Sequence, residues 1–162
     1  MSRLRLALLA LLSAWLAGPA ALQAASPPDK AIFGINWIAR STTAMGVTGD
    51  ARLTSDSITF DNRVTFPLRF VEEVVPKTPV DFMKQIPSFS LYEVLDPTPR
   101  VIRQGTGLCG GINAPERVHY LAIGHNADRD ILHVIAYRSE TPPADINFSV
   151  KGFCGGYNYF AE

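Results

Sequence analysis

The stretch Gly107-Leu108-Cys109-Gly110-Gly111-Ile112-Asn113 returns near the end of the chain as Gly152-Phe153-Cys154-Gly155-Gly156-Tyr157-Asn158. The two copies hold both cysteines of the 162-residue sequence, and its most strand-like segment, 118–138, lies between them. Two cysteines in an exported chain most simply form one bridge. We therefore predict a Cys109–Cys154 disulfide that joins the last strand to the strand entering this hairpin. A redox-active pair is the alternative, but close spacing and basic neighbours, which activate a thiol, are missing.

Residues 1–24 have the layout of a secretory signal peptide. Arg3 and Arg5 precede an apolar run over 6–16, and small residues follow through Ala25. The run is too short for a stable transmembrane anchor, although a retained membrane-anchoring helix is the alternative reading. We expect cleavage near Ala24 and a single domain over 25–162 that is periplasmic or secreted, without a stable membrane anchor.

Charge excludes two classes of partner. The whole sequence has 15 basic and 15 acidic residues. Loss of Arg3 and Arg5 with the signal leaves 13 basic against 15 acidic residues, a formal net charge of −2. A weakly acidic domain has no electrostatic reason to bind nucleic acid or an anionic membrane surface.

The segments 118–125 and 130–138 form the predicted central hairpin, with 126–129 as its loop. Leu121 then lies opposite Val134, and Ile123 lies opposite Leu132. Residues of alternate parity collect on two faces of such a hairpin. One face is aliphatic, with Leu121, Ile123, Leu132, Val134 and Ala136, and the other holds Tyr120, Ala122, His133, Ile135 and Tyr137.

A second hairpin is predicted around 61–63. A three-residue loop there pairs Phe60 with Val64 and Ile58 with Phe66, so that the apolar side chains share one face. Asn62 or Arg63 is expected to take the left-handed conformation. Because proline cannot donate to a ladder, we expect an edge or a bulge at Pro67.

The other segments complete an all-β domain. We expect an opening strand or irregular segment over 31–39, a half-buried strand over 45–54, and strands over 89–95 and 147–159. A short helix is expected from Thr78, which can cap it, to Pro87. The fold class is a small antiparallel barrel or sandwich of seven to eight strands with one short helix and one disulfide.

Metal and cofactor patterns are weak. His119 and His125 share a face of one strand but lie roughly 20 Å apart, and His133 faces the opposite side. We predict no metal site. The run 105–110 matches the dinucleotide pattern G-x-G-x-x-G, but a strand rather than a helix follows it. We therefore predict no cofactor. The glycines are expected to let the backbone bend around the disulfide.

Catalytic motifs are absent from the sequence. It contains no G-x-S-x-G, S-x-x-K or H-E-x-x-H, and we assign no catalytic residue. The adjacent Glu72 and Glu73 would face opposite sides of a strand rather than form a catalytic pair. An enzyme site assembled from distant residues stays open as an alternative, with His119 or His133 as its test positions.

The layout resembles small exported proteobacterial proteins of no assigned activity. The similarity rests on Val47-Thr48-Gly49-Asp50, on Ile58-Thr59-Phe60, on the two late cysteines and on Tyr157-Asn158-Tyr159. It covers most of the mature chain and implies a periplasmic β domain with no catalytic residues. Periplasmic lysozyme inhibitors share this size, an eight-stranded barrel and often a disulfide, although their inhibitory loop motif is missing here.

We expect a non-enzymatic binding module for a protein partner or for a small apolar or cell-wall ligand. The candidate contact surface is Tyr120, His133, Tyr137, Tyr157 and Tyr159, because tyrosine commonly lines binding surfaces. Tyrosine also fills sheet faces, so a core role for these residues is the alternative. A lysozyme-inhibitor-like protein is the second functional hypothesis, and an enzyme is the third.

Overall fold

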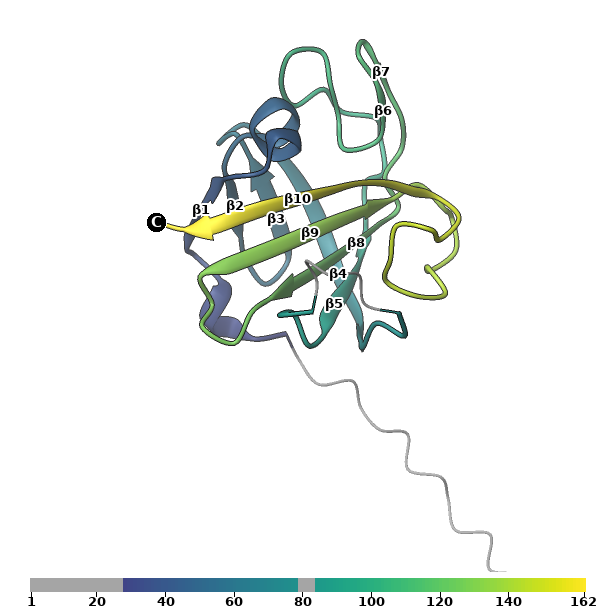
Figure 1. The fold of residues 1–162 in the computed structure, drawn as a ribbon. Coiled ribbons are helices and arrows are strands. Elements are labelled where there is room, and N and C mark those ends of the chain that lie inside the picture. The colour runs from purple at the N-terminus through teal and green to yellow at the C-terminus, as the bar shows by residue number, and fades with distance from the viewer. Residues whose placement is uncertain (1–27, 79–83) are drawn as a thin grey trace, which may run out of the picture.

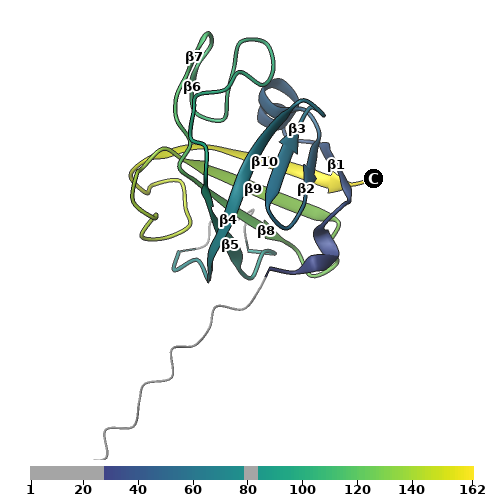
Figure 2. The same cartoon turned by 180° about the vertical axis from the view of Figure 1, so that it is seen from behind.

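Eight strands of the chain close into an antiparallel barrel in the order β1-β10-β9-β8-β5-β4-β3-β2 (Figures 1 and 2). The structure is a computed structural model that describes residues 28–78 and 84–162, so the predicted signal peptide lies outside the described residues. The barrel strands are β1 (Asn36–Ala39), β2 (Ala51–Leu53), β3 (Ser57–Phe60), β4 (Val64–Val74), β5 (Phe89–Val94), β8 (Tyr120–His125), β9 (Ile131–Tyr137) and β10 (Phe153–Ala161). The predicted all-β fold is confirmed, and it is a barrel rather than a sandwich.

Alternation along the strands sorts side chains into two clusters. Leu121, Leu132 and Val134 point into the barrel, where they pack with Trp37 at the centre of the main core. Tyr120, Ala122, Ile135 and Tyr137 lie on the outer side of β8 and β9, in a second cluster. Ile146, Phe148, Val150 and Phe153 cover that outer face. The expected strand over 147–159 is therefore wrong in its first part: residues 147–152 form bends and turns over the barrel, and β10 begins at Phe153.

The central hairpin has the predicted faces but a different register. Leu121 pairs with Ala136, Ile123 with Val134, and His125 with Leu132, so the prediction was off by two residues. Six residues, 126–131, separate the paired His125 and Leu132 instead of the expected four, and the Asn126 side chain closes this loop. Asn126 Oδ1 accepts hydrogen bonds from the backbone N–H groups of Asp130 and Ile131, both at 3.1 Å. A shift of two keeps the parity, so the inward and outward faces are unchanged.

The hairpin around 61–63 confirms the three-residue loop. Phe60 pairs with Val64 and Ile58 with Phe66, and Asn62 takes a left-handed conformation, as does Asp61. The prediction for Pro67 was wrong. Pro67 pairs with Ser57 inside the closed barrel, and the irregularity of β4 lies between Phe70 and Glu72 instead.

The first segments contain more turns than strands. Lys30–Ile32 forms a 3-10 turn, and the strand that follows covers only Asn36–Ala39. The strand expected over 45–54 is wrong for its first half, because Ala44–Thr48 winds into a short π-helical segment. Thr48 Oγ1 donates to the Ala44 carbonyl at 3.0 Å, and Gly49, at φ +61°, ends the segment. Only Ala51–Leu53 is strand.

The helix expected over 78–87 falls mainly on 79–83, which lies outside the described residues. Lys84 and Gln85, which follow, form a turn. Within the parts of the chain that the structure describes, no helix is both long and apolar enough to cross a membrane.

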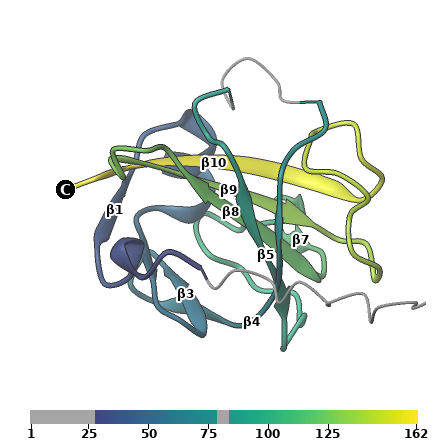
Figure 3. The ribbon, with the colours of Figure 1, turned by 90° about the horizontal axis from the view of Figure 1, so that it is seen from below.

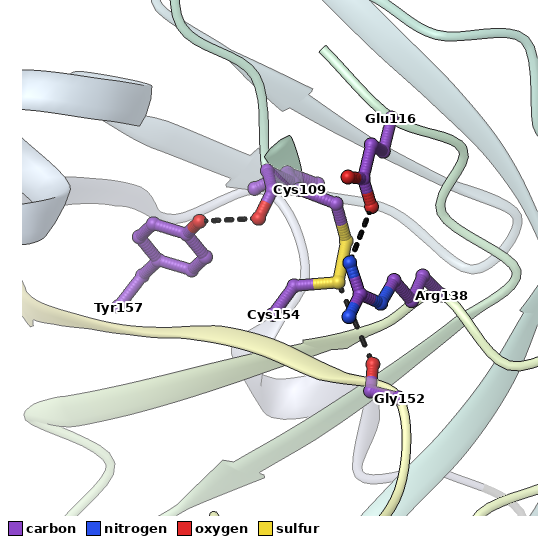
Figure 4. The surroundings of a disulfide bond; sticks show 7 residues. Cys109, Glu116, Arg138, Gly152, Cys154 and Tyr157 are labelled. Atoms are coloured by element: carbon purple, nitrogen blue, oxygen red, sulfur yellow. Dashed lines mark hydrogen bonds and ion pairs between the residues drawn. A yellow bond between two sulfur atoms is a disulfide. The ribbon is translucent and has the colours of Figure 1, made fainter. Parts of the chain in front are cut away.

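A small hairpin, β6 (Gly110–Gly111) with β7 (Ala114–Pro115), stands apart from the barrel at one end (Figures 1 and 2). In the view from below, β7 overlaps the barrel strands (Figure 3). The predicted disulfide is confirmed: Cys109, directly before β6, bonds to Cys154 in β10 with a Cα–Cα distance of 5.0 Å (Figure 4). Two further contacts hold the base of this hairpin. Tyr157 Oη donates a hydrogen bond to the Leu108 carbonyl at 2.7 Å, and Arg138 forms an ion pair with Glu116 at 2.7 Å. The bridge thus attaches this hairpin to the barrel, rather than joining two barrel strands.

Candidate functional site

The five predicted contact residues do not form one surface. Tyr157 and Tyr159 point into the barrel. Tyr120, His133 and Tyr137 lie on its outer side, the side that residues 146–153 cover. None of the five is more than 9% exposed. The four tyrosines therefore belong to the two cores, which corrects their assignment to a binding surface and agrees with the alternative role in sheet packing.

His133 lines a hollow on the outside of the barrel. We call it the His133 hollow; its volume is about 330 Å³, and its lining residues are Ser41, Thr43, His133, Phe148, Phe153, Gly156 and Asn158. Three neighbouring parts of the fold form it. Strands β9 and β10 supply the floor, because His133 pairs with Asn158 across the ladder. Phe148 and Phe153 supply a wall, and Ser41 and Thr43, which precede the π-helical segment, supply part of the rim.

Aromatic side chains form the wall. The rings of Phe148 and Phe153 lie 4.9 Å apart, and Phe153 also contacts Tyr137 edge-to-face at 6.5 Å. A β-bulge between Phe153 and Gly155 changes the parity of β10 at this point. Phe153 therefore faces outward to the wall, whereas Tyr157 and Tyr159 face inward.

Gly156 keeps the floor open. A Cβ atom at this position would lie 3.4 Å from Phe148 Cε1 and 3.8 Å from His133 Nε2. Any larger side chain would extend into the space between the wall and the histidine. The glycine therefore creates part of the hollow by leaving it unfilled.

Polar groups converge on the same space. Within the described chain Asn158 Oδ1 is buried without a hydrogen-bond partner. A buried acceptor left in that state costs about 1–3 kcal/mol. Ser41 Oγ accepts two backbone hydrogen bonds, from Ala44 at 3.0 Å and from Asn158 at 3.2 Å. Its own proton can then be donated to a ligand.

The described side chains that line the hollow are uncharged at neutral pH. Burial lowers the pKa of His133 to about 4, so its imidazole carries no charge near pH 7. The other lining residues are two phenylalanines, a glycine, an asparagine, a serine and a threonine. Among the described residues, the lining therefore offers hydrogen bonds and an apolar wall but no ionic partner.

A second, smaller hollow of about 150 Å³ lies at the end of the barrel where Asp29, Glu73, Ser88 and His125 meet. Its charged groups contact one another. Asp29 accepts a hydrogen bond from Arg129 Nε at 2.7 Å, and His125 Nε2 lies 3.6 Å from the same carboxylate. The N–H of Ala31, and then Arg129, lower the pKa of Asp29. These contacts tie the first turn of the described chain to the β8–β9 loop.

The arrangement in this second hollow does not match a nucleophile and its base. Ser88 donates its hydroxyl hydrogen to Glu73 rather than to His125. Glu73 pairs with Ser90, which faces this hollow, and Glu72 pairs with Leu91, which faces outward. The two glutamates therefore lie on opposite faces, as predicted. His119 and His125 stand at the two ends of β8, and no group of three or more metal-binding side chains occurs in the described part of the chain.

Comparisons with known proteins return no relative: no family model, no curated protein and no solved structure matches this chain. The function of the hollow is therefore inferred from its geometry. Sequence reasoning found His133 but missed its neighbours, which come from separated segments: Ser41 and Thr43, then Phe148, then Phe153 to Asn158. The sequence feature that bears on the hollow is the glycine pair before Tyr157. It indicates a position without a side chain, but it does not show which residues face that position.

Proposed function

We propose that the chain is an exported, non-enzymatic binding module that holds a small ligand in the His133 hollow. Its volume, about 330 Å³, lies at the lower end of the range of roughly 300–1,000 Å³ for small-molecule sites. An apolar wall with a few convergent polar groups and one histidine of strongly shifted pKa is the usual composition of such a site. The lining also favours holding over reaction, since its described residues include no carboxylate, thiol or amine.

The observation that carries this proposal is the position without a side chain at Gly156, between the Phe148 ring and the His133 imidazole. A glycine weakens a strand, so its presence in the middle of β10 needs a compensating reason. Space for a ligand supplies that reason. The disulfide supports an oxidising compartment, in agreement with export to the periplasm or beyond.

Native mass spectrometry of protein recovered from its own compartment tests the proposal. The wild type should retain a small molecule, and Gly156→Leu should lose it because leucine fills the hollow. Gly111→Leu is the matched control: its Cβ would meet no atom within 4 Å, and the residue lies in the separate hairpin. A wild type without any retained mass, or a Gly156→Leu variant that keeps it, would refute the binding module.

A lysozyme-inhibitor-like function is the second candidate, and the β6–β7 hairpin favours it. Ile112 lies between the two short strands and is 71% exposed, and the disulfide and the Glu116–Arg138 ion pair hold the base of the hairpin. A rigid, projecting apolar tip suits insertion into the cleft of another protein, because little conformational entropy is lost on binding.

Inhibition of a muramidase at near-stoichiometric protein tests this second candidate. Ile112→Ser should abolish the inhibition without changing the melting temperature. Val75→Ser, which alters a side chain that is 69% exposed outside the hairpin, should leave it intact. Absence of inhibition by the wild type, or equal inhibition by both variants, would remove the candidate.

A further inference from the structure

We propose that the end of the barrel around the β6–β7 hairpin docks onto an acidic protein, with Ile112 in an apolar pocket of the partner and arginines against carboxylates at the pocket rim. We call this end the hairpin surface; it comprises Met45, residues 61–63, residues 95–119 and Arg138. The inference rests on the second candidate function, in which the hairpin is the contact element, and it adds the chemistry of the partner.

The loop between β5 and β8 is far longer than the barrel requires. These two strands pair directly and antiparallel, and a turn of two residues can join such neighbours. Here residues 95–119 join them. Loops longer than about 12–15 residues are uncommon in compact domains, and ordered ones are usually functional. The excursion therefore serves a purpose other than closing the barrel.

Contacts within the loop fix its shape. Ile102 and Leu108 are each 2% exposed and anchor the loop in the main core. The backbone N–H of Asn113 donates to the Gly105 carbonyl at 2.7 Å. Gln104 and Asn113 hold left-handed conformations, at φ +47° and +57°, which are uncommon for residues other than glycine. A loop that is ordered in advance loses little conformational entropy when a partner binds it.

Neighbouring segments hold the loop and enlarge the surface. Arg63 donates a hydrogen bond to the Ile102 carbonyl at 2.8 Å, and Arg103 donates one to the Met45 carbonyl at 3.0 Å. The helical turn with Met45 therefore lies at the same end of the barrel as β6 and β7 (Figures 1 and 2). The large apolar side chains of this surface that are between 48% and 71% exposed are Met45, Leu95, Val101 and Ile112. Ile112, the most exposed of them, lies at the tip of the hairpin, where the pocket of a partner would remove it from water.

Charge on the hairpin surface favours an acidic partner. With His119 counted as neutral, the surface holds five arginines against three carboxylates, a formal net charge of +2, whereas the whole sequence has 15 basic and 15 acidic residues. The arginines are Arg63, Arg100, Arg103, Arg117 and Arg138, and the carboxylates are Asp61, Asp96 and Glu116. Four of the arginines pair with these carboxylates, but Arg117, exposed two residues after β7, forms no ion pair within the described chain. A carboxylate of the partner would supply that counter-charge and steer the encounter.

The composition of the loop favours a protein over a membrane. Residues 95–119 contain no tryptophan, tyrosine or phenylalanine, and no lysine. Segments that lie in a lipid surface depend on those aromatic residues and on lysine as well as arginine. Protein interfaces are enriched in arginine and methionine and depleted in lysine. A folded acidic protein with an apolar pocket is therefore the partner that fits this surface.

Photo-crosslinking in the producing cells, followed by titration of the purified pair, tests the inference. The full chain carries p-benzoylphenylalanine in place of Ile112 or, as a control, in place of Val75, which has similar exposure and lies outside the hairpin surface. We expect one acidic protein to be crosslinked from position 112 and not from position 75. That protein, once purified, should bind the oxidised mature chain, and the Kd should rise about tenfold between low salt and about 0.3 M salt because screening weakens ionic contacts.

Variants of exposed residues separate the two parts of the surface. Ile112→Ser and Arg117→Glu should each weaken binding of the purified partner at least tenfold, and both should keep the wild-type melting temperature. Lys30→Glu is the matched control for charge. It reverses an exposed cation in the first turn of the described chain, outside the hairpin surface, and should change the Kd less than twofold.

Several results would overturn the inference. These are the absence of a crosslinked protein at position 112, a crosslink to a second copy of this chain, and binding of the wild type to vesicles of phosphatidylglycerol and phosphatidylethanolamine in place of a protein. Binding that Arg117→Glu and added salt leave unchanged would also overturn it, even if that partner is a muramidase, whose inhibition would then support the second candidate function alone. A crosslinked acidic protein that meets the tests above but is no muramidase would support the hairpin surface and remove that candidate.

Discussion

Cys109 and Cys154 connect a hairpin that lies outside the barrel to β10, the strand that pairs with β1 to close it. Closure itself depends on backbone hydrogen bonds between β10 and its neighbours β1 and β9. The bridge therefore has two separable effects: it restricts the unfolded chain, and it holds the β6–β7 hairpin in place.

Replacing both cysteines by serine should destabilise the protein without opening the barrel. The bridge spans 45 residues, and the chain-entropy model then gives a loss of about 4 kcal/mol in the free energy of unfolding. Guanidinium unfolding measures the loss, and hydrogen exchange should show faster exchange of the hairpin amides while β8 and β9 stay protected. Glu116→Gln, which removes only the exposed ion pair with Arg138, should cost less than about 1 kcal/mol. Loss of protection throughout the barrel would contradict this division of roles.

Replacing Asn126 by alanine should destabilise the central hairpin. The Asn126 side chain is nearly buried and accepts two backbone hydrogen bonds that close the loop, so alanine leaves two N–H groups without that acceptor. The expected cost is about 1–3 kcal/mol in the free energy of unfolding. Asp128→Ala, an exposed change in the same loop, should stay within about 0.5 kcal/mol. Equal effects of the two variants in thermal unfolding would show that the asparagine contacts contribute nothing.

The same asparagine shows what a sequence can and cannot predict. Which side of β8 and β9 faces the core follows from alternation with a period of two, and an error of two residues in register leaves it intact. Loop length depends on a side chain that folds back onto the backbone, and alternation carries no information about that. For the hairpin at 61–63, only a three-residue loop put all apolar residues on one face, so the register was predictable.

Other features depended on contacts between distant segments. The apolar spacing around Met45 and Val47 fits a strand, but Thr48 bonds to Tyr159, which is 111 residues away, and the segment winds into a helical turn. The His133 hollow is similar, because its lining comes from four separated stretches of chain: 41–43, 133, 148 and 153–158. Local patterns identified His133 as a residue on an outer face, but they could not place Phe148 and Ser41 beside it.

Replacing Tyr159 by phenylalanine separates a core role from a binding role. Tyr159 is fully buried inside the barrel, and its hydroxyl forms a 2.7 Å hydrogen bond with Thr48 Oγ1. Removal of that hydroxyl should lower the free energy of unfolding by about 1 kcal/mol, and Tyr159→Ala should cost about 3–5 kcal/mol through the cavity it leaves. Chemical denaturation measures both costs. Tyr159→Phe should leave ligand retention in native mass spectrometry unchanged, and a loss of the retained mass would assign the tyrosine to the binding site after all.

The stability of the protein should fall between pH 6.5 and pH 4 because of His133. Burial lowers the pKa of this histidine to about 4 in the folded state, from an ordinary value of 6.5 in the unfolded chain. Within that window the unfolded chain binds a proton that the folded protein does not, so acid favours unfolding. The contribution is fully present above pH 6.5, is lost as the pH falls towards 4, and amounts to about 3 kcal/mol in total. Comparison with His133→Gln isolates it, since His119 and His125 remain in both proteins and their effects cancel. The difference in unfolding free energy between wild type and variant should be constant above pH 7 and should shift by this amount down to pH 4. A difference that does not change with pH would mean that the folded protein binds the proton as readily as the unfolded chain, so that burial does not lower the pKa of His133.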